Sequence, residues 1–217
     1  MGIAGIGCER MPDVSMLELS TTSGEDCADR NPTLGDRSYL VHDGEVALVV
    51  DPQRDIDRVL RLAGEAGVRI TNIFETHIHN DYVTGGLALA RQTGAAYHVN
   101  AADPVAYQRT GVRDGDLVEV SPTLRIRVLA TPGHTFTHLS YVLHQNGADV
   151  AVFSGGSLLF GSTGRPDLLG PARTHTLVRE QYASAHRAGR LPCSSWRSRS
   201  GCSPGGAWEP SVAADPS

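Results

Sequence analysis

The sequence predicts an α/β fold in which helices and sheets stack in layers. Three observations indicate this. Residues 38–99 alternate between strand-like and helix-like patterns, and residues 117–153 contain short strand-like runs between turns. The 217 residues also include 24 glycines and 12 prolines, a content that is typical of a chain with many turns.

The first half of the predicted domain begins with two strands. Residues 38–41 and 46–50 are short apolar runs separated by a His-Asp-Gly turn, which is a β-hairpin pattern. From residue 55 to 66, apolar residues recur at the spacing of an amphipathic helix, and Gly67 supplies the residue that ends it. Residues 70–74 then predict a buried strand.

A second helical pattern begins at Gly85 and is closed by Gly94, and residues 95–99 form the next predicted strand. Beyond it, Arg125 and Arg127 alternate with apolar residues, which indicates a sheet with one solvent-facing side. The strands predicted for this second half are residues 117–120, 124–129, 139–143 and 150–153.

The ends of the chain differ in composition from its middle. The last regular pattern is a helix over residues 176–188. Residues 1–35 are polar and turn-rich, and residues 192–217 are dominated by Ser, Gly, Pro and Arg. The expected organisation is a poorly ordered arm over 1–35, one domain over 36–191, and a low-complexity tail over 192–217.

Charge and hydropathy narrow the function classes. The formal net charge is −5 and the sequence pI is about 6.0, so a nucleic-acid-binding surface is not expected. The apolar N-terminal run stops after eight residues, which is too short for a signal peptide or a membrane span. We therefore expect a cytoplasmic protein that binds neither nucleic acid nor membrane.

Histidine and aspartate alternate directly after the predicted strand at 70–74. Residues two apart in an extended segment point the same way, so His77, His79 and Asp81 are expected to converge on one point. Two imidazoles and a carboxylate suit Zn²⁺ or Fe²⁺. His134 follows another predicted strand in a tight Pro-Gly turn that can hold it toward the same edge.

Four motifs stand in a fixed order along the chain: Thr76-His-Ile-His-Asn-Asp-Tyr-Val-Thr-Gly-Gly86, Thr131-Pro-Gly-His-Thr135, Phe153-Ser-Gly-Gly-Ser-Leu-Leu159 and Gly164-Arg-Pro-Asp-Leu168. In these motifs the chain resembles the metallo-β-lactamase superfamily over about residues 36–191. Within it the chain looks most like the persulfide dioxygenase (sulfur dioxygenase) branch, and next most like glyoxalase II. The resemblance implies an αββα sandwich with the metal at one edge.

The ligands that the resemblance implies are only partly present. In the dioxygenase branch, iron is held by the residues that match His77 and His134 and by an aspartate where this chain has Gly156. The binuclear zinc branches also need a histidine where this chain has Tyr82, and a late Pro-x-His-Gly motif that does not occur after Ala188. We therefore expect weakened or absent metal binding and a domain that is incomplete toward its C-terminus.

A single-ion site loses one protein ligand of three, so the resemblance favours one Fe(II), with Zn(II) as the alternative. Asp81, water or Asp167 are the open candidates for the missing ligand. His79 and Asp81 are auxiliary ligands in this interpretation, Asp81 and Tyr82 act in catalysis, and Arg165 binds a substrate carboxylate. A structural pair between Arg165 and Asp167 is the competing interpretation of that arginine.

The implied reaction is oxidation of a glutathione or other low-molecular-weight persulfide to sulfite and thiol. The alternatives are a zinc-dependent thioester hydrolase of the glyoxalase II type and a non-catalytic sulfur-relay or scaffold module. Longer members of the persulfide dioxygenase branch carry rhodanese domains, so a rhodanese partner on another chain is compatible with the resemblance. The abrupt change in composition near residue 192 leads us to expect a frameshift or truncation there, and the sequence leaves the oligomeric state open.

Overall fold

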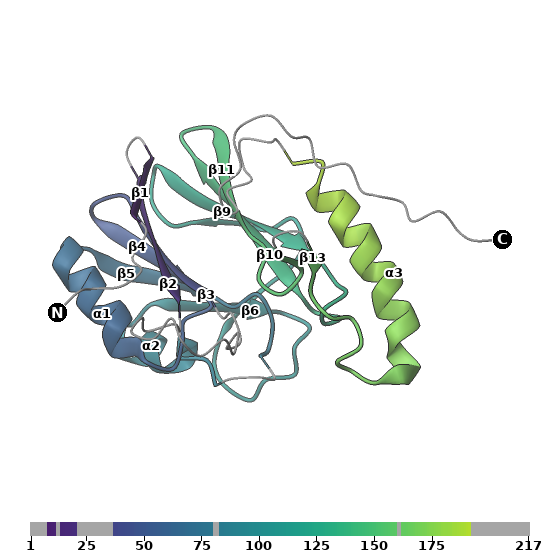
Figure 1. Ribbon diagram of the computed structural model, residues 1–217. Coiled ribbons are helices and arrows are strands. Elements are labelled where there is room, and N and C mark those ends of the chain that lie inside the picture. The colour runs from purple at the N-terminus through teal and green to yellow at the C-terminus, as the bar shows by residue number, and fades with distance from the viewer. Residues whose placement is uncertain (1–7, 12–13, 21–36, 80–82, 160–161, 192–217) are drawn as a thin grey trace, which may run out of the picture.

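The computed structural model describes residues 8–11, 14–20, 37–79, 83–159 and 162–191. Two β-sheets pack face to face, with α1 and α2 beside the first sheet and α3 beside the second (Figure 1). The predicted αββα sandwich is therefore confirmed.

The first sheet has seven strands in sequential order. Neighbours from β1 to β4 are antiparallel, whereas those from β4 to β7 are parallel, so β4, β5 and β6 all end at one edge. The strands are β1 (Cys8–Met11), β2 (Val14–Ser20), β3 (Arg37–His42), β4 (Val46–Val50), β5 (Arg69–Phe74), β6 (Ala96–Asn100) and β7 (Thr110–Val112).

The second sheet is antiparallel, in the order β11-β10-β9-β8. Along β9, Arg125 is exposed and Arg127 half-buried while their apolar neighbours are buried, as the alternation predicted. The strands are β8 (Leu117–Glu119), β9 (Leu124–Ala130), β10 (Leu139–Gln145) and β11 (Ala148–Phe153), and a small hairpin follows of β12 (Leu158–Leu159) and β13 (Ser162–Thr163).

Two apolar clusters hold the layers together. The first lies between the sheets, where Phe74 and Leu48 of one sheet pack with Tyr141 and Ile126 of the other. The second fills the space between the first sheet and its helices, as with Val49 against Leu62. Burial of apolar surface at about 25 cal/mol per Å² is the main force that stabilises such layers.

The helices follow the sequence signals that predicted them. Helix α1 (Ile56–Ala66) ends at Gly67, which has the left-handed φ of 69° typical of a helix-ending glycine. Helix α2 (Gly86–Thr93) ends in the same way at Gly94. Helix α3 (Pro171–Ala188) starts five residues before the predicted position, because Pro171 suits the first turn of a helix. None of the described helices combines the length and the apolar character that crossing a membrane requires.

Several strands were not predicted. Part of the expected arm forms β1 and β2, which pair with each other and extend the first sheet through β3. The short strands β7, β12 and β13 also lacked a sequence signal, because two or three residues are too few to show a period of two. Residues 1–7, 12–13 and 21–35 of the expected arm, and the expected tail over 192–217, lie outside the described residues.

Candidate metal centre

The loop after β5 and the loop after β9 meet at one edge of the sandwich. His77 and His79 follow β5 of the first sheet, and His134 lies between β9 and β10 of the second sheet. The backbone N–H of Leu139 donates to the carbonyl oxygen of Thr76 at 2.7 Å, so the loop that ends in β10 is bonded directly to the first sheet. The packing of the two sheets therefore places the histidines together.

Three predicted ligands form one cluster. The ring centroids of His77 and His79 are 4.1 Å apart, and those of His77 and His134 are 4.8 Å apart. The expected convergence of His77 and His79, with His134 held toward the same edge, agrees with this placement. Asp81 and Tyr82, which the sequence also placed at the site, lie outside the described residues.

Each of these histidines has one ring nitrogen bonded to the protein. His77 Nδ1 lies 2.9 Å from Thr76 Oγ1, and His134 Nδ1 lies 3.3 Å from the carbonyl oxygen of Arg165. Such contacts fix the orientation and the tautomer of histidines that bind metals. In both rings Nε2 is the nitrogen that an ion would take.

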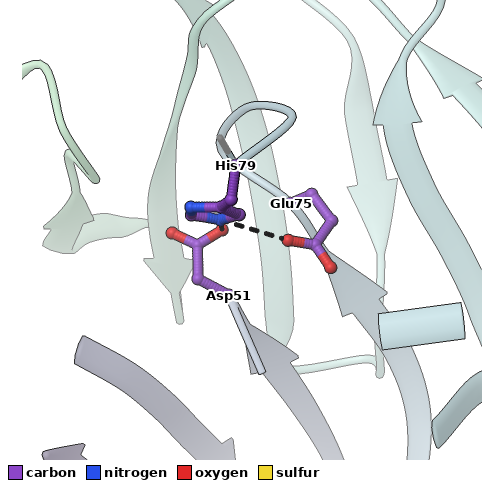
Figure 2. Close-up of side chains that lie close together, drawn as sticks. All are labelled: Asp51, Glu75 and His79. Carbon is purple, nitrogen blue, oxygen red and sulfur yellow. Dashed lines mark hydrogen bonds and ion pairs between the residues drawn. The ribbon is translucent and has the colours of Figure 1, made fainter. Parts of the chain in front are cut away.

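His79 is anchored by two buried carboxylates (Figure 2). Its Nε2 lies 3.4 Å from Asp51 Oδ1 and 3.4 Å from Glu75 Oε2. Burial disfavours the charged imidazole, yet the hydrogen bonds to Asp51 and then Glu75 outweigh it and raise the pKa of His79 to about 10. Without a bound ion, His79 is therefore an imidazolium at neutral pH.

The pKa values of the two carboxylates are shifted in opposite directions. Burial opposes ionisation of Asp51, but its hydrogen bond with His79 holds the pKa of Asp51 below its usual value. Burial and the negative charge of Asp51 raise the pKa of Glu75. Asp51 is therefore the more readily ionised of the two carboxylates that face the His79 imidazolium.

The ligand atoms of Asp51, Glu75 and His79 all lie within 4.8 Å of one another, a spacing that would suit an ion. Their other contacts argue for a supporting role, however. Asp51 accepts hydrogen bonds from the Thr76 backbone N–H at 2.7 Å and from Thr76 Oγ1 at 2.8 Å. Glu75 Oε1 accepts from Tyr97 Oη at 2.9 Å and from Thr84 Oγ1. These carboxylates therefore orient His79.

Gly156 lies directly beside His134. A Cβ atom at position 156 would be 2.5 Å from His134 Cδ2 and 2.7 Å from its Nε2, so the imidazole fills the space that a side chain there would need. No carboxylate enters the cluster from this position. The position at which the resemblance expects the third ligand thus lies next to His134 Nε2, the nitrogen that an ion would take, and it carries no side chain.

Arg165 lies beside His134 through its carbonyl oxygen, but its guanidinium is engaged elsewhere. It forms two parallel hydrogen bonds to Asp167, of 3.0 and 2.8 Å. Both side chains are strongly exposed. The structural pair that competed with substrate binding is therefore present.

Three participants had no sequence signal that marked them. Asp51 directly follows β4, twenty-five positions before Thr76, and reaches the site because β4 and β5 are neighbours. Glu75 directly follows β5 and is buried, but nothing in the sequence of the motif indicates that it is buried. His138 ends the loop that carries His134, and it is fully buried in the cluster, its ring centroid 5.0 Å from that of His77.

The donors fit an ion that accepts imidazole nitrogen. Three imidazoles converge, and the buried Nε2 of His138 beside them has no hydrogen-bond partner among the described residues. This donor set suits Zn²⁺ or Fe²⁺ better than ions that prefer oxygen.

The fold and the site together define a class: an αββα sandwich with a histidine cluster on the loops at one edge. The family to which the chain belongs is the metallo-beta-lactamase superfamily, whose model matches residues 34–194.

The curated relatives reported for this family share one name. A hydroxyacylglutathione hydrolase of Polaromonas sp. is 35% identical over 131 residues, which is 58% of this chain and 49% of that protein. One from Nitrosococcus oceani is 37% identical over the same shares. The chain therefore spans about half the length of the curated relatives it matches.

Solved structures agree on the fold. A metallo-beta-lactamase from Staphylococcus aureus is 31% identical, with a TM-score of 0.67 over 73% of this chain and 50% of that chain. ETHE1 from Myxococcus xanthus is 33% identical, with a TM-score of 0.62 over 72% of this chain and 66% of that chain.

Proposed function

We propose that the chain binds one Fe(II) on His77, His79 and His134 and oxidises a low-molecular-weight persulfide to sulfite and thiol. The reaction balances as RSSH + O₂ + H₂O → RSH + SO₃²⁻ + 2H⁺. The observation that carries the proposal is the convergence of three anchored imidazoles beside Gly156, where no carboxylate enters. This arrangement favours a single ion with positions left for small ligands.

A bound iron would supply the redox chemistry that joins oxygen to sulfur. The protein's part is to present neutral imidazoles in fixed orientations. Thr76 holds Nδ1 of His77, the carbonyl of Arg165 holds Nδ1 of His134, and Asp51 with Glu75 keeps a proton on Nε2 of His79. Loss of the second His79 proton, from Nδ1, prepares that nitrogen as a ligand.

The surroundings of the histidines suit a thiol carrier that is partly apolar. Ile78 and Phe136 lie on the histidine-bearing loops and are 38% and 44% exposed. Leu159 and Leu168 flank the segment that contains Gly164 and Arg165, and both are about half exposed. In this proposal Arg165 meets a substrate carboxylate by exchanging its exposed partner Asp167.

A thioester hydrolase is the second candidate, and the names of the curated relatives favour it. Tyr82 and Gly156 stand against it, because a binuclear zinc site of that type needs a histidine and an aspartate at these positions. The two functions differ in whether O₂ is consumed.

The test compares two substrates on the full chain loaded anaerobically with Fe(II) or Zn(II). We expect O₂ uptake and sulfite formation with glutathione persulfide on the iron form, abolished in His77→Ala and His134→Ala and retained in His144→Ala. Hydrolysis of a glutathione thioester by the zinc form, without persulfide oxidation, would establish the second candidate. Absence of both reactions would leave the non-catalytic alternative.

A further inference from the structure

His138 has an unused nitrogen in a fully buried position. Its side chain is 0% exposed, and Nδ1 lies 2.9 Å from Thr131 Oγ1. Its Nε2 has no hydrogen-bond partner among the described residues. A buried polar atom without a partner costs about 1–3 kcal/mol, so such an atom calls for an explanation.

The position of the ring agrees with a shared ion. Imidazoles bind such ions at about 2.0–2.1 Å, and with a ring radius of roughly 1.2 Å, two rings on one ion have centroids at most about 6.5 Å apart. The His138 centroid is 5.0 Å from that of His77 and 6.1 Å from that of His134. Both separations lie within this limit, as do those from His77 to His79 and to His134.

The hydrogen bonds behind His138 permit the required tautomer. Thr131 Oγ1 lies 2.9 Å from His138 Nδ1 and 2.8 Å from Ser140 Oγ. When Nδ1–H donates to Thr131 and the Thr131 hydroxyl donates to Ser140, the lone pair of the imidazole is on Nε2. This is the usual arrangement behind a histidine that binds a metal.

Gly156 supplies no ligand, because glycine has no side chain. A fourth protein ligand, beyond the three imidazoles, would have to come from another residue. The nearby described carboxylates, Asp51 and Glu75, contact Nε2 of His79. Among the described residues, His138 offers a further buried nitrogen beside the cluster.

We propose that Nε2 of His138 is a ligand of the same ion, which is then held by four imidazoles: His77, His79, His134 and His138. The inference rests on the proposed function in one respect, the presence of the ion, and it does not depend on which reaction the ion supports. Four neutral ligands leave the full charge of the ion to attract an anionic sulfur substrate.

The experiment counts imidazole ligands by X-ray absorption on the zinc-loaded full chain, with Co(II) absorption spectra as a second readout. We expect four imidazoles in the wild type and three in His138→Phe, which keeps the ring stacking on His77. The dissociation constant should rise tenfold or more. His98→Phe is the matched control, because His98 is also buried with an unpartnered Nδ1, and it should keep four.

His138→Gln, which can keep the hydrogen bond to Thr131, is the second variant if His138→Phe does not fold. If the folded His138 variant has the same imidazole count and the same Co(II) spectrum as the wild type, this inference is overturned while the proposed function stands. A wild-type count of three would do the same. A wild-type chain that binds no ion would overturn both this inference and the proposed function.

Discussion

The buried charge pair behind His79 makes a quantitative prediction for Asp51→Asn in the metal-free protein. Asparagine keeps the size of the side chain but removes the charge that faces the imidazolium. Raising the pKa of His79 from 6.5 to about 10 corresponds to roughly 5 kcal/mol at about 1.4 kcal/mol per unit. Asp51 makes the larger contribution to this shift and Glu75 the smaller, so we expect Asp51→Asn to lower stability by about 3 kcal/mol at pH 7.

The pH dependence has a defined sign. A histidine whose pKa is raised by folding contributes stability that is fully present below about pH 6.5 and is lost as pH rises through about 10. The difference between wild type and Asp51→Asn should therefore shrink toward pH 10.

Urea unfolding with chelator present, at several pH values, measures this difference. Asp149→Asn is the control, because Asp149 also lies 3.1 Å from a histidine, His144, but in a more exposed pair. We expect it to cost about 1 kcal/mol or less. A loss below 1 kcal/mol for Asp51→Asn at pH 7, or a loss that grows toward pH 10, would refute the reasoning.

Three further predictions concern other parts of the structure. Gly133 has a φ of 143°, and a Cβ there would lie 2.5 Å from the backbone of Gln181 in α3. Thermal unfolding should therefore show that Gly133→Ala costs more than about 2 kcal/mol of stability. The control Gly115→Ala, at a φ of 84° but with open space around the new Cβ, should cost about 1 kcal/mol. Burial lowers the pKa of His98 to about 4, so stability should fall by roughly 3 kcal/mol from pH 6.5 to 4, and His98→Gln should remove that loss in acid titrations. Loading with zinc at a hundred times its dissociation constant should raise unfolding free energy by about 2.7 kcal/mol, and an excess of chelator should reverse it.

The fold was predictable where one element carries its own signal. The stripe of α1 and its final glycine lie within twelve consecutive residues, and the alternation along β9 is similarly local. The hairpin of β1 and β2 was not predictable in this way. In the sequence, β2 and β3 are separated by residues 21–36. Their pairing is therefore a long-range contact, which a local hydrophobic period does not predict.

The same distinction applies to the site. His77, His79 and His134 follow strands in compact motifs, so spacing was enough to nominate them. Asp51 and His138 contribute because β4 lies beside β5 and because the loop before β10 bonds to Thr76. These contacts arise from sheet order and sheet packing.

The central claim is that this histidine cluster holds one iron ion that oxidises persulfides. The most direct measurement is O₂ consumed against sulfite formed, per bound iron, by the full chain with glutathione persulfide. The account predicts one iron per chain and one sulfite for each O₂, with O₂ uptake and sulfite formation both lost in His134→Ala. Iron bound at that stoichiometry without O₂ uptake, or turnover that survives His134→Ala, would contradict it.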